Sequence, residues 1–240
     1  MRKRGTMNNL KFSQHGVTLI EILIALALSI IIVLAMLRAF VTTGKVTAEA
    51  SLGAQSDSSM MLGLIAADRI VQGIGFGDVS SYGTNLKAYK FEANGADTYS
   101  VITDITNAEN AEYLVWKVAT NKCQALRNAS NGLLLYGKGA GYACTNLSKP
   151  NVTNDPVERL IQISDAVQNI SFEASKSAEN KIGAMTIKVI QKNCWPFGIV
   201  NTTDLKPGKY QVVIATNTYA ASTETAAQKI ENTTCLFNFK

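Results

Sequence analysis

The chain has 240 residues and a formal net charge of +5, with 23 Lys and Arg residues against 18 Asp and Glu residues. Four of the basic residues and no acidic residue lie within residues 1–16, so the remaining chain carries 19 basic and 18 acidic residues, a balance that argues against a strongly basic nucleic-acid-binding surface. The only histidine is His15, so residues 17–240 exclude His-based acid–base catalysis, His-containing triads and His metal sites.

The first predicted element is a long apolar helix that follows the basic segment. Residues 17–41 read VTLIEILIALALSIIIVLAMLRAFV, and no charged residue occurs from Ile22 to Leu37. As a helix this run would span roughly 37 Å, whereas about 20 apolar residues are enough to cross a bilayer core. Glu21 lies inside the run, where a carboxylate costs on the order of 2.5–3.5 kcal/mol, and we therefore interpret it as a functional residue.

This pattern resembles the type IV prepilin family, which includes pilins, minor pilins and the pseudopilins of type II secretion. Members share a short basic leader ending in Gly, one further residue, the sequence Thr-Leu-Ile-Glu and an apolar helix. Gly16 and residues 18–21 match, whereas Val17 stands where the family usually has an aromatic residue or Met. An ordinary membrane anchor with an incidental Glu is the alternative.

The resemblance implies a specific maturation and assembly chemistry. A membrane-embedded prepilin peptidase would cut between Gly16 and Val17 on the cytoplasmic side, where the basic leader remains, and would methylate the Val17 amine. Glu21 would then pair with the Val17 ammonium of a neighbouring subunit. Such a pair offsets the desolvation of both charges in a medium of low dielectric constant.

The helix is predicted to continue beyond the membrane segment and to end at the three glycines within residues 73–77. We predict one helix over residues 18–74, about 85 Å long, with a flexible middle that contains Gly44 and Gly53. Two helices divided in that region are the alternative. The second half should be amphipathic, because one apolar stripe follows helical spacing: Met60, Leu64, Ala67, Val71 and Ile74.

From residue 99 onward the hydrophobic period changes to that of β-strands. The alternation of apolar and polar residues is clearest in residues 185–191 and 210–216. Residues 167–172 resemble the stretch that precedes the main sheet in PilW-type minor pilins. The predicted strands are residues 99–105, 113–119, 133–136, 160–163, 167–174, 185–191, 210–216 and 235–239.

These elements predict an α+β fold in which a long N-terminal helix packs on an antiparallel β-sheet, as in pilins. The expected organisation is a cleaved leader (1–16), a transmembrane and assembly helix (17–41), its amphipathic continuation (42–76) and a periplasmic β-rich headpiece (77–240).

Four cysteines lie in the predicted headpiece: Cys123, Cys144, Cys194 and Cys235. An even number of cysteines outside the inner membrane indicates disulfides, for which three connectivities exist. We favour Cys123–Cys144 and Cys194–Cys235, because each pair joins neighbours in sequence and closes one insertion. The disulfide that closes the shorter loop would contribute ~3 kcal/mol to the free energy of unfolding. Zinc binding is disfavoured, because the chain has no Cys-x-x-Cys motif and no His beyond the leader.

Other candidate sites are weaker. Trp195 and Phe197 lie near Lys192 and would suit a stacking surface for single-stranded DNA or another partner, although core packing is the commoner role of such aromatic residues. With a mature charge near +1, we expect any contact with DNA or surfaces to be weak. No motif places a nucleophile beside a base, so we predict neither an enzyme nor a cofactor or metal site.

The predicted function is that of a minor pilin closest to the PilW type, a structural subunit that acts in pilus assembly or priming near the tip. The implied partners are the prepilin peptidase, other minor pilins, the major pilin and inner-membrane lipid. The alternatives are a J-type pseudopilin of a type II secretion system and a tip module that binds DNA or surfaces. The implied location is the bacterial inner membrane, with the headpiece in the periplasm, and then the pilus.

Overall fold

The structure is a computed structural model that describes residues 18–75, 81–92, 98–103, 105, 109–129, 132–163, 185–195, 207–218 and 229–239. The chain divides into two units, Met1–Ala48 and Glu49–Lys240. The described part of the first unit is helix alone. The second unit contains the end of that helix and every described strand. The α+β class and the long N-terminal helix are therefore as predicted.

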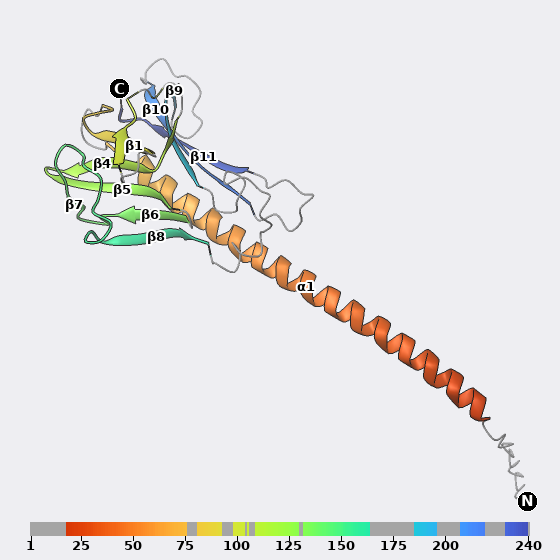
Figure 1. The fold of residues 1–240 in the computed structure, drawn as a ribbon. Helices are drawn as coiled ribbons and strands as arrows, with labels where there is room; N and C mark the ends of the chain where they lie inside the picture. Colours follow the sequence, from red (N-terminus) through yellow and green to blue (C-terminus); the bar gives the residue numbers. More distant parts are fainter. Residues whose placement is uncertain are drawn as a thin grey trace, which may run out of the picture. The chain divides into compact units, whose positions relative to one another are not determined.

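Helix α1 (Leu19–Gln72) is a single helix of 54 residues (Figure 1). At its end, Gly73 N and Ile74 N donate hydrogen bonds to carbonyl oxygens three residues earlier, which tightens the last turn. Gly75 then adopts a left-handed conformation with a φ of +73°, which a glycine reaches without steric cost. The prediction of one helix that ends at the glycine cluster is confirmed, and the alternative of two helices is wrong.

One face of α1 is buried in the second unit, where side chains of both sheets join it in one hydrophobic core. Complete burial of an aliphatic side chain contributes ~1.5–3 kcal/mol relative to exposure, so this face holds the helix to the sheets. The predicted stripe forms the buried face, and each of its members is at most 3% exposed: Met60, Leu64, Ala67, Val71 and Ile74.

Gly63 lies on the same face and allows close contact with strand β8 (Val157–Gln162). A Cβ atom added at Gly63 would lie 2.0 Å from Ile161 Cγ1 and 2.5 Å from the Leu160 carbonyl oxygen. The helix backbone and the strand therefore touch directly. This contact was not predictable from the sequence, because a single glycine within a helical pattern indicates only a weaker helix.

The first of two sheets is antiparallel and seven-stranded, with the order β2-β1-β4-β5-β6-β8 and with β7 paired to β5 (Figure 1). Its two faces have different neighbours, because side chains alternate along a strand. Leu114 and Trp116 belong to the core that contains α1, whereas Tyr113 and Val115 belong to a second cluster on the opposite face. Besides β8, the strands are β1 (Leu86–Glu92), β2 (Thr98–Val101), β4 (Tyr113–Ala119), β5 (Lys122–Ala129), β6 (Gly132–Tyr136) and β7 (Tyr142–Ala143).

The second sheet is antiparallel and four-stranded, with the order β11-β10-β9-β3. Its strands are β3 (Asn110–Ala111), β9 (Thr186–Cys194), β10 (Gly208–Asn217) and β11 (Lys229–Leu236). Three polar contacts link α1 and the turn that follows it to β10, β11 and the turn after β11. Thr216 Oγ1 donates to Met60 Sδ at 3.7 Å, Thr234 Oγ1 donates to Asp68 Oδ1, and Asn238 Nδ2 donates to the Ile74 carbonyl oxygen at 3.2 Å.

The strand predictions were correct in part. Residues 113–119 match β4, and the predictions at 99–105, 133–136, 160–163, 185–191 and 210–216 overlap β2, β6, β8, β9 and β10. The prediction at 235–239 was wrong in its bounds, because β11 ends at Leu236. The two-residue strands β3 and β7 were missed, as were the longer strands β1 and β5. Neither of these two strands contains Val, Ile or Thr, the β-branched residues that a strand prediction relies on. The predicted strand at 167–174 lies outside the described residues.

Candidate functional site

Of the N-terminal candidates, the structure describes Glu21. Gly16 and Val17 lie outside the described residues. Glu21 lies in the first turn of the helix, where the Thr18 carbonyl oxygen accepts a hydrogen bond from its amide at 3.0 Å. The Thr18 hydroxyl also approaches Glu21 Oε2 at 3.5 Å. The positive end of the helix dipole favours a carboxylate at this position.

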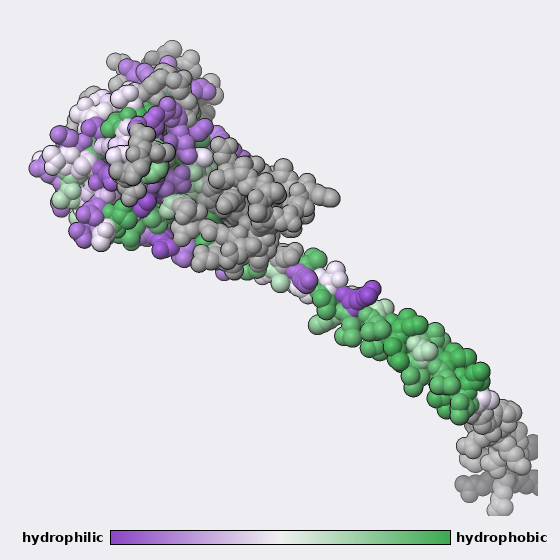
Figure 2. All heavy atoms as spheres, viewed as in Figure 1, coloured by the Kyte–Doolittle hydropathy of each residue, from purple (hydrophilic) through white to green (hydrophobic). Residues whose placement is uncertain are grey.

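The apolar run after Glu21 is uncovered. Every large apolar residue between residues 19 and 41 is at least 50% exposed, and Figure 2 shows this part of α1 as a continuous hydrophobic surface. The helix is long and apolar enough to cross a membrane. A surface of this kind needs lipid or other apolar helices around it, and its backbone is already satisfied by the helix itself. The N-terminal segment is therefore suited to membrane anchoring.

The four cysteines form two disulfides, Cys123–Cys144 and Cys194–Cys235, which are the pairs favoured from the sequence. Each has a Cα–Cα distance of 5.7 Å, within the usual range. The second disulfide joins β9 to β11, the two neighbours of β10. Gly208 at the start of β10 makes room for it, because an added Cβ atom would lie 3.1 Å from Cys235 Sγ.

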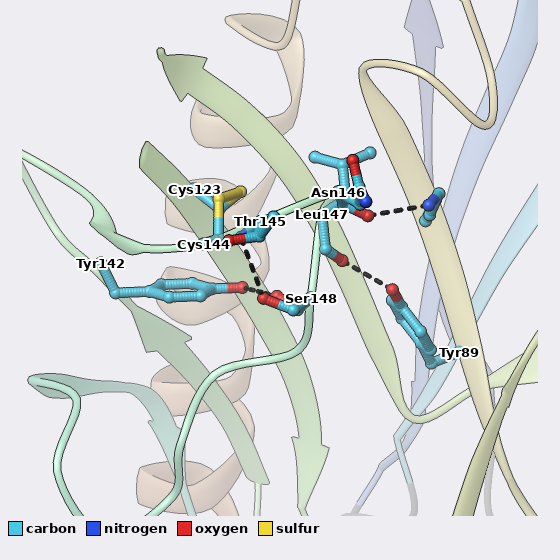
Figure 3. Close-up of a disulfide and its surroundings, with 9 residues drawn as sticks. Tyr89, Cys123, Tyr142, Cys144, Thr145, Asn146, Leu147 and Ser148 are labelled. Carbon is cyan, nitrogen blue, oxygen red and sulfur yellow. Dashed lines mark hydrogen bonds between the residues drawn. A yellow bond between two sulfur atoms is a disulfide. The ribbon is translucent and has the colours of Figure 1, made fainter. Parts of the chain in front are cut away.

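The first disulfide anchors a loop on the outer face of the seven-stranded sheet (Figure 3). The Tyr89 hydroxyl donates to the Leu147 carbonyl oxygen at 2.6 Å, and the Tyr142 hydroxyl donates to the Ser148 carbonyl oxygen at 2.9 Å. Leu147 is only 4% exposed and has a φ of +59°, which is unusual for a bulky residue. The loop is thus held by a covalent bond, two hydroxyls and one buried side chain.

Burial raises the pKa of both hydroxyls, those of Tyr89 and Tyr142. They remain protonated donors at neutral pH and serve the backbone of the loop. The cluster around Cys123 and Cys144 therefore has a structural role.

Of the other sequence candidates, the structure describes Lys192 and Trp195. Trp195 is partly buried directly after Cys194, at the end of β9, and Lys192 is exposed on the same strand. Phe197 lies outside the described residues. The proposal of a stacking surface at these aromatic residues therefore stays a prediction.

A cleft of about 450 Å³ was not predicted from the sequence. Two of the strands that line it are β1, which was missed, and β5, which was also missed. Its polar residues come from three separate stretches of the chain, around residues 90, 109–112 and 128, and form no known motif. The lining residues are Lys90, Phe91, Glu109, Asn110, Glu112 and Asn128.

The comparisons with known proteins concern the N-terminus. Residues 11–37 match the family model described as the prokaryotic N-terminal methylation motif, and this range contains Gly16, Val17 and Glu21. Comparison with curated proteins and with solved structures finds no match.

Proposed function

We propose that this chain, a type IV pilin-like or pseudopilin protein by its N-terminal methylation motif, is a minor pilin of a type IV pilus. It would act as a structural subunit, without catalysis, in a priming complex near the tip with other minor pilins of the PilW kind. The observation that carries the proposal is Glu21, which lies within the matched motif at the start of an uncovered apolar helix.

The maturation steps follow from that motif. Prepilin peptidase would remove residues 1–16, and the Val17 amine would be methylated. The helix would hold the subunit in the inner membrane until it is moved into the filament beside the major pilin. The headpiece would lie in the periplasm, an oxidising compartment that suits the two disulfides.

Glu21 would supply the assembly contact by pairing with the Val17 ammonium of a neighbouring subunit. The apolar surface that surrounds Glu21 would be shared with lipid before assembly and with neighbouring helices afterwards. In either setting an unpaired carboxylate is costly, and pairing with an ammonium offsets that cost. The pair would therefore favour the assembled state.

The test is the variant Glu21→Leu, examined by fractionation of cells and sheared pili. We expect normal insertion and leader cleavage, because the change makes the run more apolar and leaves Gly16 intact. We expect incorporation into pili to fall at least tenfold, because the partner ammonium would be buried without its counter-charge. Ser29→Leu is the matched control, since it removes the only hydroxyl between residues 22 and 37 and retains the carboxylate.

Two results would contradict the proposal. One is a Glu21→Leu protein that enters filaments as well as the parent protein. The other is a parent protein that is absent from pili and is instead required for protein secretion. The second result would identify a J-type pseudopilin of a type II secretion system, which shares the same N-terminal motif.

A further inference from the structure

The C-terminal segment of the chain (residues 235–239) packs against the end of α1. Leu236 and Phe239 are at most 1% exposed. Both belong to the hydrophobic core that also contains Ile74 and the apolar stripe of the helix. Asn238 Nδ2 donates a hydrogen bond to the Ile74 carbonyl oxygen at 3.2 Å. The C-terminal segment therefore seats the last turn of α1 by apolar and polar contacts together.

Backbone hydrogen bonds and one disulfide hold the C-terminal segment in place. Lys209 N, at the start of β10, donates to the Phe239 carbonyl oxygen at 2.9 Å. The disulfide between Cys194 and Cys235 adds a covalent link to β9, which lies on the other side of β10. Strand β11 stands at one end of the strand order of its sheet, next to β10. The disulfide therefore ties a terminal strand to the strand two places away.

The end of the four-stranded sheet is shaped around this disulfide. Strands two places apart are separated by ~9.5 Å, twice the spacing of neighbours. The Cα atoms of Cys194 and Cys235 are only 5.7 Å apart. Gly208 lies between them, beside an irregularity in the pairing of β9 and β10, and a Cβ atom added there would lie 2.7 Å from the Leu236 carbonyl oxygen. The disulfide thus draws the two outer strands together over a glycine, and the C-terminal segment begins at that point.

The two disulfides differ in burial and in what they hold. Cys123 and Cys144 are buried in the cluster on the outer face of the seven-stranded sheet, opposite the face that packs on α1. Cys194 is also buried, whereas Cys235 is partly exposed. Thiol–disulfide exchange requires that a thiolate reach one of the two sulfur atoms. The exposure of Cys235 therefore favours attack on the disulfide that holds the C-terminal segment.

We propose that the Cys194–Cys235 disulfide is a redox-sensitive latch for the end of α1. In the reduced protein the C-terminal segment would lose its covalent link to β9 and would open locally from the last turn of the helix. The helix would stay docked nearer its middle, because Gly63 lies directly against β8 of the other sheet. The end of α1 would thus be fully seated only in an oxidising environment. This inference goes beyond the proposed role in assembly and does not depend on it.

The latch opens by thiol–disulfide exchange with a dithiol. A thiolate of the dithiol attacks Cys235 Sγ, the disulfide bond breaks, and Cys194 leaves as a thiolate that takes up a proton. The second thiol of the dithiol then attacks the mixed disulfide and releases Cys235 as a thiol. Two electrons pass from the dithiol to the protein, each cysteine gains one proton, and the dithiol becomes a disulfide. Closing is the reverse exchange with a disulfide oxidant.

The experiment uses the full-length protein in detergent, with dithiothreitol as the dithiol. Free thiols are blocked with iodoacetamide at successive times, and peptide mass mapping identifies which disulfide has opened. We expect Cys194–Cys235 to open at least tenfold faster than Cys123–Cys144.

Amide hydrogen exchange then locates the structural effect of opening the latch. In protein with only Cys194–Cys235 open, we expect exchange to be at least tenfold faster in residues 67–75 and 234–239 than in the oxidised protein. Exchange in β4 and β5 should stay within twofold, because those strands belong to the other sheet. Oxidised glutathione should restore the original rates.

Matched double variants separate the latch from a general loss of stability. Cys194→Ser with Cys235→Ser should reproduce the faster exchange at the end of α1, whereas Cys123→Ser with Cys144→Ser should leave it within twofold. If the first variant does not fold, the partly reduced parent protein supplies the same measurement. The proposal is overturned if Cys123–Cys144 opens first or if the end of α1 keeps its exchange rates after the latch opens. Equal loss of protection in β4 and β5 would also overturn it, because the disulfide would then stabilise the whole unit and not the helix end.

Discussion

Two glycines of α1 have opposite surroundings. At Gly63 the helix backbone touches β8, and an added Cβ atom would lie 2.0 Å from Ile161 Cγ1. At Gly44 nothing lies within 4 Å of the same position. The first glycine is therefore required by packing, whereas the second contributes only backbone freedom to the helix.

We expect Gly63→Ala to destabilise the second unit by ~1–3 kcal/mol, because the helix must move away from β8 to relieve the clash. Gly44→Ala is the matched control in the same helix. It should not lower the free energy of unfolding, since Ala is the better helix former. The measurement is denaturant unfolding of the full-length protein in detergent, followed by circular dichroism. Equal stability of Gly63→Ala and the parent protein would show that the helix and strand are not in close contact.

Tyr142 makes stability depend on pH in alkaline solution. Burial raises the pKa of its hydroxyl above the ordinary value of 10.0, so the folded protein keeps a proton that the unfolded chain releases. The stability that this group contributes is complete below about pH 10 and is lost as the pH rises further.

For Tyr142→Phe we expect the free energy of unfolding to fall by ~0.5–1.5 kcal/mol at pH 7, because the hydrogen bond to the Ser148 carbonyl oxygen is removed. Between pH 10 and pH 11 the variant should lose stability less steeply than the parent protein. Urea unfolding at intervals from pH 7 to pH 11 measures both effects. Parallel curves for the two proteins would exclude Tyr142 as a source of the alkaline decline.

At the scale of elements, α1 is held to the four-stranded sheet by polar contacts as well as by its apolar stripe. The Thr234 hydroxyl donates to Asp68, whose other carboxylate oxygen accepts from Gln72 at 2.7 Å. Thr234 is 4% exposed, so this contact is shielded from water. The carboxylate lies off the predicted stripe, yet it faces β11.

We expect Thr234→Val to lower the free energy of unfolding by ~1–3 kcal/mol, because the Asp68 side chain loses a hydrogen-bond donor. Thr233→Val on the same strand is the control, since Thr233 is exposed and its replacement should stay within about 0.5 kcal/mol of the parent. Chemical denaturation of the three proteins at neutral pH provides the measurement. Equal losses in both variants would mean that strand propensity, and not the contact with Asp68, determines the effect.

Elements with strong periodicity were predictable, and those without it were not. The stripe from Met60 to Ile74 follows helical spacing, because one face of the helix lies in the core. Strand β4 begins with four apolar residues, because both of its faces are buried there. Strand β5 has buried side chains on both faces, including Cys123 and Leu126, and its small and polar residues show no strand preference. Strand β5 is buried by contacts with other parts of the fold, and the local sequence pattern does not show that these contacts form.

The candidate sites also differ in whether a local sequence pattern reveals them. Glu21 and its neighbours form a continuous motif, so one stretch of sequence was enough to identify them. The cleft beside Phe91 joins residues from β1, β3 and β5 and exists only after the two sheets have formed. No spacing along the chain relates Phe91 to Asn128, and the sequence therefore carried no signal for the cleft.

At the scale of the whole molecule, the chain is built for two environments. The first unit exposes apolar residues along its described helix, whereas the second buries its apolar residues between α1 and two sheets. The excess positive charge lies in residues 1–16, ahead of the apolar run. This order suits a leader that stays in the cytoplasm while the chain beyond the helix is exported.

We expect the mature protein to begin at Val17, with or without one methyl group on its amine. Mass analysis of the N-terminal peptide from membrane-derived protein measures this directly. Gly16→Arg should leave the precursor uncut, while Gly44→Ala should be processed normally. An N-terminus near Ala25 or Ala27, as an ordinary signal peptidase would produce, would contradict the maturation proposed here.

The polar contacts of α1 also bear on the order in which the protein is made. Met60, Asp68 and Ile74 contact residues that follow them by 156, 166 and 164 positions. During synthesis the helix is made long before these partners, so its apolar face is uncovered until they follow. Contacts of such high sequence separation slow folding and lengthen the time for which a nascent chain is prone to aggregation. The core around α1 is therefore complete only after β10 and β11 have been made.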